Sequence, residues 1–356
     1  MKIGIIGLPQ TGKRTLFGLL TGARIDGPFD SAKMPEGVAE ILDPRFDRLN
    51  ALYRPKKETR ARLSVQLLPD LDSESIREGK IFRDIAGLDA LCHVVRAFRD
   101  DSVYHVSGAV DPARDIEFVN AELLLHDLLF IEKRFERMEK DAKRTRAEAL
   151  KKEAEVLQKF KRHLEADRPL RALAVSAEEG KVVSGYPFIT MKSMIVALNV
   201  SEGDLTDSGL SGTLAARFQG QGMTIMRISA KLEAEIATLS SAEEREAFLK
   251  DAGIEEPALH LLSRLCMDAV GLISFFTVGE DEVRQWLIPK GASAPEAGGA
   301  IHSDIQRGFI RAEVIQYGDL MEYGSEEAVK KAGKLSAMGK DYRVADGDII
   351  NFRFNV

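Results

Sequence analysis

The first 22 residues constrain the fold of this chain more than any other segment. They read MKIGIIGLPQTGKRTLFGLLTG: an apolar stretch, a glycine-bounded turn and a second apolar stretch with helical spacing. Gly7, Gly12 and Lys13 match the pattern GxxxxGK, in which backbone N–H groups surround phosphate oxygens and the lysine reaches the β- and γ-phosphates. The segment therefore predicts a strand, a phosphate-binding loop and a helix, in that order.

One residue departs from the complete motif. The position after the lysine normally carries a Ser or Thr hydroxyl for Mg²⁺, and here it carries Arg14, whose guanidinium has five donors and no acceptor. Thr15, one residue later, is placed to hydrogen-bond the α-phosphate. The loop therefore predicts nucleotide binding and leaves Mg²⁺ uncertain. The predicted contacts are Gly7, Pro9, Gln10, Thr11, Gly12, Lys13, Arg14 and Thr15.

Composition places the chain among globular proteins. Its 356 residues are 44% hydrophobic and 30% charged, which suits two or three domains with cores of their own. The net charge of −6 means that contact with a nucleic acid would need a local basic patch, and we expect no sequence-specific reading of DNA. Two distant cysteines and the lack of a leader or membrane-spanning pattern predict a cytoplasmic protein without membrane contact.

Four further apolar runs, at 63–68, 91–98, 171–176 and 193–200, predict strands of a parallel sheet because helical patterns separate them. Beyond residue 265 the pattern changes. Residues 271–291 predict a β-hairpin, 291–300 a loop, 308–315 and 348–356 strands, and 325–335 a short helix. These elements predict a smaller, separate α+β unit.

Between residues 115 and 166 the chain has the pattern of a long, charged helical hairpin. A coiled-coil seam with a four-three spacing runs down its first helix, and a weaker apolar stripe follows on the second. The predicted tip carries Lys143, Arg144 and Arg146. A solvated face is the ordinary interpretation of such a charged tip, and a partner-binding surface is the hypothesis that we carry forward. The seam comprises Leu124, Leu128, Ile131, Phe135 and Met138, and the stripe comprises Leu150, Ala154, Leu157 and Leu164.

Many spaced segments of the chain resemble the YchF or Obg-like ATPase family of translation-factor P-loop proteins, of which this sequence looks like a divergent member. They include GLPQTGKRTLF, LDPRFDRL, HVVRAF, HVSGAVDPARDIEFVNAELLL, LNVSE, SAKLEAEI and DGDIINFRFNV. The resemblance implies an α/β fold: a P-loop G domain (1–115 and 167–270), an inserted helical coiled-coil hairpin (116–166) and a C-terminal β-grasp domain of the TGS type (271–356). It also implies binding of ATP or GTP and association with a ribosome or RNA.

The resemblance locates the base-binding residues as well. GTPases of this class use NKxD, whereas the family has an NxxE form and prefers adenine; NVSE supplies Asn199, Val200 and Glu202 at these positions. Ser229, Ala230 and Lys231 match the loop that closes over the base. An adenine nucleotide is therefore the expected ligand.

The hydrolytic elements depart from the family pattern. The first switch segment reads PFDS at 28–31, which leaves Ser31 as a candidate metal ligand. The strand at 63–68 runs into PDLD instead of DxxG, so Asp70 or Asp72 could meet metal-bound water, but no glycine amide follows for the γ-phosphate. The letters DIAG do occur at 84–87, where we interpret them as part of a helix.

Three functions remain open from the sequence. The first is a nucleotide-binding protein that prefers ATP, associates with a ribosome or RNA, and hydrolyses weakly or not at all. The second is a functioning ATPase or GTPase with a rearranged Mg²⁺ site. The third is an interaction adaptor with a vestigial pocket.

Overall fold

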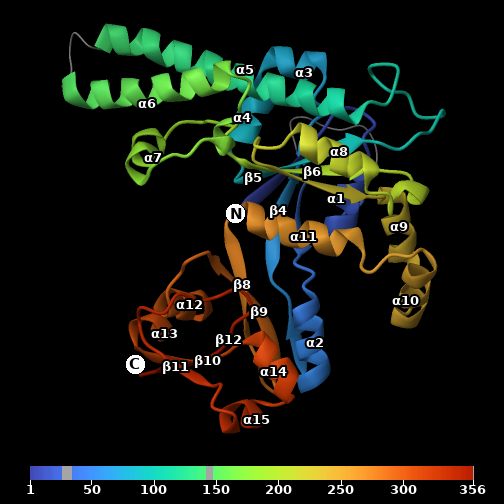
Figure 1. Cartoon of the computed structure of the whole chain (residues 1–356), viewed down its shortest axis with the longest axis vertical. Coiled ribbons are helices and arrows are strands. Elements are labelled where there is room, and N and C mark those ends of the chain that lie inside the picture. The colour runs from blue at the N-terminus through green and yellow to red at the C-terminus, as the bar shows by residue number, and fades with distance from the viewer. Residues whose placement is uncertain (26–33, 142–146, 356) are drawn as a thin grey trace. The chain divides into compact units, whose positions relative to one another are not determined.

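The computed structural model describes residues 1–25, 34–141 and 147–355. It divides into two compact units (Figure 1). The first unit comprises Met1–Gly37 and Ser64–Leu259, and the second comprises Val38–Leu63 and His260–Val356. The second unit thus includes residues 38–63, which the predicted domain boundaries placed in the nucleotide-binding domain; those boundaries stay predictions.

The first unit is built on a six-stranded sheet with the order β2-β4-β1-β5-β6-β7. The pairs β1–β4, β1–β5, β5–β6 and β6–β7 are parallel, as the continuous apolar runs predict. Every residue of β5 is buried, which is typical of a strand covered on both faces. The strands are β1 (Lys2–Ile6), β2 (Glu36–Glu40), β4 (Arg62–Leu67), β5 (Ala90–Arg96), β6 (Ser193–Asn199) and β7 (Met223–Ile228).

Helices pack on this sheet through a core that joins β5 and β6 to α4, α5 and α8. The phosphate-loop helix α1 follows β1 directly, as predicted. The helices are α1 (Lys13–Thr21), α3 (Ser73–Glu78), α4 (Lys80–Ala86), α5 (Pro112–Asp141), α6 (Ala147–Glu165), α7 (Ala177–Val183), α8 (Gly209–Arg217), α9 (Ala230–Thr238), α10 (Ala242–Asp251) and α11 (Ala258–Ala269), which continues into the second unit.

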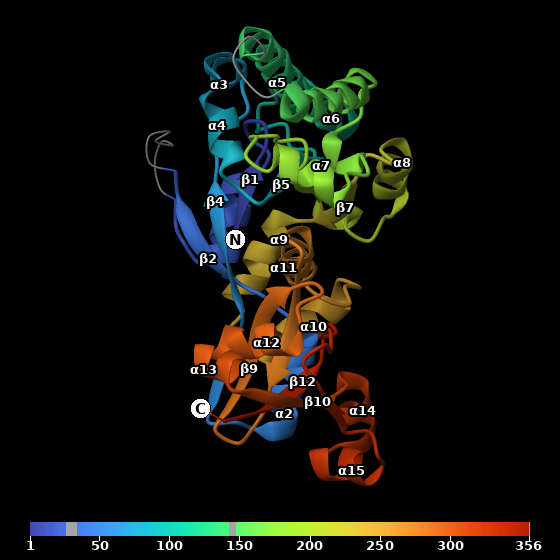
Figure 2. The ribbon, with the colours of Figure 1, turned by 90° about the vertical axis from the view of Figure 1, so that its left-hand side faces the viewer.

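Helices α5 and α6 form the predicted hairpin and run side by side (Figure 2). Leu124, Ile131 and Met138 of the predicted seam are buried against Leu157 and Leu164 of α6. The remaining seam and stripe residues pack against the same cluster. The heptad pattern therefore identified the contact face correctly, because the burial of this stripe is what holds the two helices together.

Two predicted elements are wrong. Residues 171–176 do not form a strand: a 3₁₀ turn (Leu170–Ala172) is followed by Ser176, which caps α7. Strands β5 and β6 pair with each other over seven positions and leave no place between them for another strand. The predicted loop at 291–300 contains α12 (Ala294–Ile301), whose capping box joins Ser293 and Glu296.

The second unit has a mixed sheet with the order β11-β10-β12-β8-β9-β3, and it contains the predicted hairpin, strands and short helix. Its buried residues form two clusters, one on α12 and α13 and the other on α2, α14 and α15. The elements are α2 (Pro44–Tyr53), β3 (Lys57–Thr59), β8 (Leu272–Thr277), β9 (Glu282–Pro289), α12, α13 (Ser303–Arg307), β10 (Phe309–Ile315), α14 (Tyr317–Tyr323), α15 (Glu326–Lys331), β11 (Ser336–Met338) and β12 (Ile349–Phe354).

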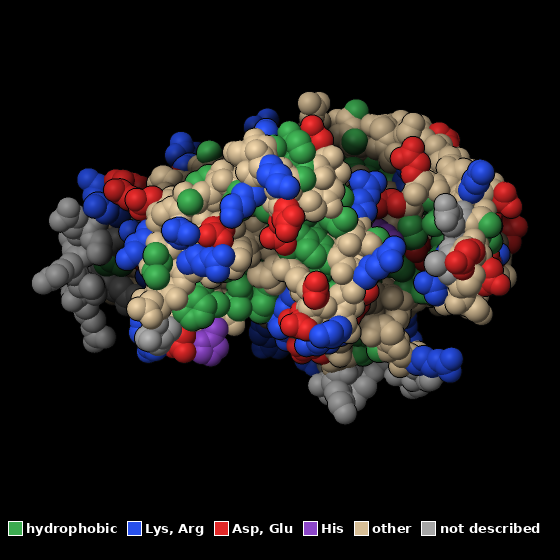
Figure 3. Space-filling model, turned by 90° about the horizontal axis from the view of Figure 1, so that it is seen from below, with side chains coloured by type: hydrophobic (Ala, Val, Ile, Leu, Met, Phe, Trp, Pro, Cys, Tyr) green, Lys and Arg blue, Asp and Glu red, His purple; other side chains and the backbone are tan. Residues whose placement is uncertain are grey.

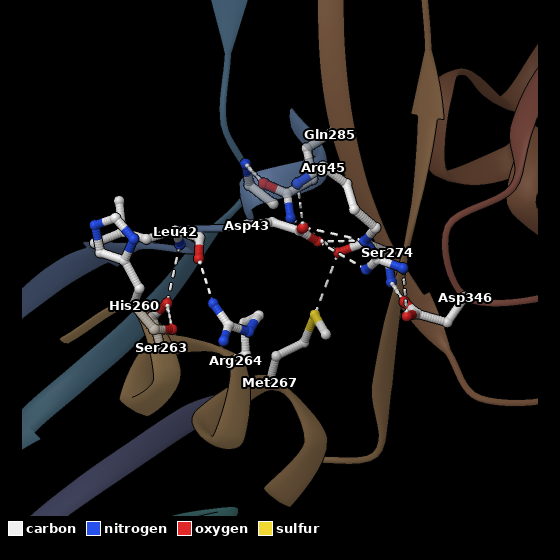
Figure 4. A network of polar contacts seen from close by, with 11 residues as sticks. Leu42, Asp43, Arg45, His260, Ser263, Arg264, Met267, Ser274, Gln285 and Asp346 are labelled. Carbon is white, nitrogen blue, oxygen red and sulfur yellow. Dashed lines mark hydrogen bonds and ion pairs between the residues drawn. The ribbon is translucent and has the colours of Figure 1, made fainter. Parts of the chain in front are cut away.

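A polar network explains why residues 38–63 belong to this unit (Figure 4). Asp43 caps α2 and pairs with Arg45, whose other nitrogen contacts Asp346 at 2.7 Å. The backbone N–H of Leu42 donates to Ser263 Oγ on α11 at 2.9 Å. These contacts join residues 42–45, at the start of α2, to elements more than 200 residues later in the chain, and they satisfy polar groups that folding buries.

None of the helices within residues 1–25, 34–141 and 147–355 combines the length and apolar character of a membrane span.

Candidate nucleotide-binding site

The phosphate loop lies at the carboxyl end of β1, and its two motif glycines have steric reasons to be there. A Cβ on Gly7 would come within 2.6 Å of the Val94 carbonyl oxygen on β5. Gly12 has φ 89° and precedes α1, and a Cβ there would collide with the Asn199 side chain. Only glycine combines this close approach with a left-handed backbone. The pattern GxxxxGK therefore reflects the packing of this loop against β5 and β6.

Lys13 is buried, and its ammonium group makes hydrogen bonds and an ion pair within the protein. Its Nζ donates to the carbonyl oxygens of Leu68 at 3.0 Å and Pro69 at 2.6 Å, and it pairs with Asp70 Oδ1 at 2.9 Å. Burial lowers the pKa of Lys13 to about 8, against the opposing effect of Asp70. The lysine is thus held by the residues after β4, and a phosphate would have to compete with Asp70 for it.

The Mg²⁺ site stays a prediction, because only one of its two candidate ligands, Asp70, lies in the described residues. Arg14 is half-buried in the first turn of α1 and has no acceptor to offer. Asp70 is paired with Lys13, and Asp72 accepts from the Ser75 N–H at 2.8 Å as the cap of α3. Residues 1–25, 34–141 and 147–355 contain no group of three or more His, Cys, Asp and Glu side chains suited to a metal ion. Ser31 lies outside the described residues.

The DIAG letters at 84–87 are helical, as we interpreted them. Asp84 and Ile85 lie inside α4, and Gly87 ends it with φ −75°. This segment is therefore no substitute for the DxxG turn that the chain lacks after β4.

The base side of the site is held together by Asn199 at the carboxyl end of β6. Its Nδ2 donates to the Thr11 carbonyl oxygen at 3.0 Å, and its Oδ1 accepts from the Ala230 N–H at 3.0 Å. Only 5% of Asn199 is exposed. Ser229 caps α9, which begins at Ala230. One side chain therefore joins the phosphate loop to the loop predicted to close over the base.

These loops surround a pocket of about 440 Å³, within the range usual for small-molecule sites. Eight of the predicted contact residues line it, whereas Gly7, Pro9, Gln10, Thr11, Lys13 and Arg14 lie outside its lining. The lining residues are Gly12, Thr15, Phe98, Arg99, Asp100, Asn199, Val200, Ser201, Glu202, Ser229, Ala230 and Lys231.

Sequence reasoning missed Phe98, Arg99, Asp100 and Ser201. A signal for the first three was present, because they follow β5, which lies between the strands that carry the phosphate loop and NVSE. Parallel strands end at the same edge of a sheet, where ligands of such folds bind. The predicted partner-binding residues Lys143, Arg144 and Arg146 lie outside the described residues.

The whole chain is similar to proteins of known families. The "Ribosome-binding ATPase YchF" of Bacillus subtilis is 41% identical over 363 residues, covering 99% of each chain. "Obg-like ATPase 1" of Oryza sativa subsp. japonica is 36% identical and covers 100% of this chain and 92% of its own length. A family model for the C-terminal part of YchF GTPases, described as a protein of unknown function, matches residues 272–355.

Among solved structures, the Schizosaccharomyces pombe YchF GTPase superposes with a TM-score of 0.81 at 30% identity, covering 99% of this chain and 97% of that one. A GTP-binding protein from Pyrococcus horikoshii OT3 gives a TM-score of 0.57 at 19% identity and covers 100% of both chains, which supports the fold alone. The predicted fold class, an α/β P-loop protein with a C-terminal YchF-type domain, is confirmed.

Proposed function

Because the chain belongs to the YchF and Obg-like ATPase family, we propose that it binds a purine nucleotide between the loop of residues 7–13 and the NVSE segment. The observation that carries this proposal is the double hydrogen bond of Asn199, a pocket-lining residue whose side chain joins the Thr11 carbonyl group of the phosphate loop to the Ala230 N–H of the pocket lining. The backbone N–H groups of the loop and the start of α1 suit phosphate oxygens.

We propose adenine as the preferred base. The relatives' names differ in the nucleotide, ATPase for the Bacillus subtilis and Oryza sativa proteins and GTPase for the yeast structure, whereas this chain's own residues favour adenine. The Asn199 side chain already makes hydrogen bonds to Thr11 and Ala230. Glu202, an exposed residue of the pocket lining, occupies the position of the aspartate in NKxD. A site matched to one base edge leaves donors or acceptors unpaired with the other base.

We further propose that binding depends little on Mg²⁺ and that hydrolysis is slow or absent. The Arg14 guanidinium, in the first turn of α1, can donate charge-assisted hydrogen bonds to β or γ oxygens and so replace part of the metal's charge neutralisation. A cation that neutralises the bound phosphate in this way does not stabilise the charge that develops in the transition state. Binding is therefore compatible with this chain's residues, and efficient turnover is not.

Calorimetric titration of ATP and of GTP, each in Mg²⁺ and in excess EDTA, tests these proposals together with a phosphate-release assay. We expect tighter binding of ATP than of GTP, and similar ATP affinity in both buffers. Affinity that collapses in EDTA, or turnover at the roughly 1–100 s⁻¹ of efficient phosphotransferases, would identify a functioning hydrolase with a rearranged Mg²⁺ site. No binding of either nucleotide would favour the adaptor function.

A ribosome or RNA partner is the second part of the proposal, supported by relatives named as ribosome-binding. On the face in Figure 3, described Lys and Arg side chains are interspersed with Asp and Glu, so this face carries no large basic patch. The basic residues Lys143, Arg144 and Arg146 remain the proposed contact, together with the C-terminal unit. Phosphate contacts make such binding salt-dependent.

Reversal of these three charges tests that contact. We expect weaker ribosome co-sedimentation at several salt concentrations and unchanged ATP affinity. A pellet fraction equal to that of the unaltered protein would exclude this contact.

A further inference from the structure

Among the described residues, Arg96 is the largest fully buried side chain, with 2% of its surface exposed, and it lies at the last position of β5. Placing a guanidinium in the interior is costly unless its donors are satisfied. Its nitrogens donate to four backbone carbonyl oxygens: Phe98 at 3.3 Å, Asp100 at 3.0 Å, Val103 at 3.0 Å and Tyr104 at 3.1 Å. None of these four acceptors is a carboxylate.

All four acceptors belong to one loop, residues 98–104, which supplies Phe98, Arg99 and Asp100 to the pocket lining. The Arg96 guanidinium carbon also lies 4.6 Å from the centre of the Phe98 ring, an arrangement suited to cation–π attraction. Arg96 therefore holds both the backbone of this loop and the ring that the loop contributes to the pocket.

The ends of the loop are held by other residues. The N–H groups of Ala97 and Phe98 donate to the Asn199 carbonyl oxygen at 2.8 and 2.9 Å. Beyond the loop, the buried His105 contacts Asp115 through Nε2 at 3.0 Å. Within the loop, the N–H groups of Ser102 and Val103 donate to Asp100 at 2.9 and 3.1 Å. The Arg96 guanidinium adds the contacts that tie this turn to β5, because its planar donors reach several carbonyl groups at once.

Arg96 and Asn199 are also direct neighbours across the β5–β6 pair. Asn199 joins the phosphate loop to Ala230, and Arg96 holds the neighbouring loop 98–104, which lines the same pocket. We infer that Arg96 is a positioning residue of the nucleotide site, which holds loop 98–104 in the shape that receives the base and ribose. This inference rests on the proposed nucleotide binding.

The test compares ATP with inorganic tripolyphosphate, which can occupy the phosphate loop but has no base. The variant is Arg96→Lys, which keeps the positive charge and removes the planar guanidinium with its several N–H donors. We expect its ATP dissociation constant to rise at least about tenfold, and that for tripolyphosphate to change by less than about twofold. Arg171→Lys is the matched control, because Arg171 also donates to a backbone carbonyl, that of Gln221 at 3.0 Å, and lies outside the pocket lining.

The outcomes separate the inference from the proposed function. If the unaltered protein binds ATP more tightly than tripolyphosphate, but Arg96→Lys leaves that difference unchanged, the positioning role of Arg96 is wrong. If the unaltered protein binds neither compound, the proposed function fails first. Circular dichroism and a urea titration check that each variant is folded.

Hydrogen exchange on the unaltered protein gives a second measurement that no folding defect can obscure. We expect ATP to protect the amides of residues 98–104 more than tripolyphosphate does, because only ATP fills the space beside them. Equal protection by the two compounds would overturn the inference.

Discussion

Two parts of the proposed nucleotide site differ in preorganisation: the base side, around Asn199 and loop 98–104, and the phosphate side, around Lys13. On the base side, Asn199 and Arg96 use their side-chain donors and acceptors to fix the loops that line the pocket. On the phosphate side, Lys13 is engaged by Asp70 and two carbonyl groups at the end of β4. In the proposed complex the loops around the base are therefore preorganised, whereas a triphosphate would displace existing contacts of Lys13.

Under the proposed function, nucleotide binding and hydrolysis can separate within one site. A preorganised base wall costs little ordering when the ligand arrives, so it supports affinity. Catalysis needs groups aimed at the charge that develops during the reaction, and here Arg14, Asp70 and Asp72 are a donor, an ion-pair partner and a helix cap. The three predictions below test the two sides separately.

The largest effect is expected on the base side, from Asn199→Ala. The change leaves the Thr11 carbonyl and the Ala230 N–H without their partner, and each unsatisfied buried group costs about 1–3 kcal/mol. We expect ATP affinity to fall about a hundredfold in calorimetric titration. The control is Asn120→Ala, which removes an equally buried asparagine outside the pocket lining. Equal losses in the two variants would mean that Asn199 only stabilises the fold.

The next largest effect on ATP affinity is expected from the protonation of Lys13 as the pH changes. Its pKa is lowered to about 8 in the unliganded protein, and a bound triphosphate favours the charged form and raises that pKa. Above pH 8, Lys13 then takes up a proton when ATP binds, so ATP affinity falls by up to about tenfold for each pH unit of increase. Below pH 8, Lys13 is already charged and adds no pH dependence to ATP binding.

Titrations between pH 7.5 and 9.5 measure this slope. Lys13→Arg should flatten it, because arginine stays charged throughout this range. If the pH dependence persists in Lys13→Arg, the proton taken up on ATP binding belongs to another group.

The smallest effect is expected from Asp70→Asn, which removes the carboxylate that competes with phosphate for Lys13. Because about a third of the Asp70 side chain is exposed, its ion pair with Lys13 contributes about 1 kcal/mol or less. We expect ATP affinity to rise about threefold to fivefold. Asp72→Asn is the control, since asparagine also caps helices and Asp72 caps α3. Weaker binding in Asp70→Asn would show that Asp70 assists the ligand.

Local sequence patterns were sufficient to predict those parts of the fold that depend on residues close together in the chain. The glycine spacing predicted the phosphate loop, the heptad seam predicted the α5–α6 contact, and helical context identified DIAG as part of α4. Such patterns were insufficient at residues 171–176, where an apolar run forms a 3₁₀ turn and leads into the Ser176 cap of α7. The capping box at Ser293 was visible in the sequence, but its alanines and glycines were interpreted as a loop.

The sequence by itself determined the phosphate-loop motif, the strands at 63–68, 91–98 and 193–200 and the α5–α6 hairpin, because turn geometry and hydrophobic periodicity act over a few residues. Tertiary structure decided that residues 38–63 pack with the C-terminal unit and that Lys13 pairs with Asp70. It also decided that Arg96 shapes the pocket wall beside Asn199. These outcomes depend on which polar groups become buried together, and burial brings together residues that are distant in the chain.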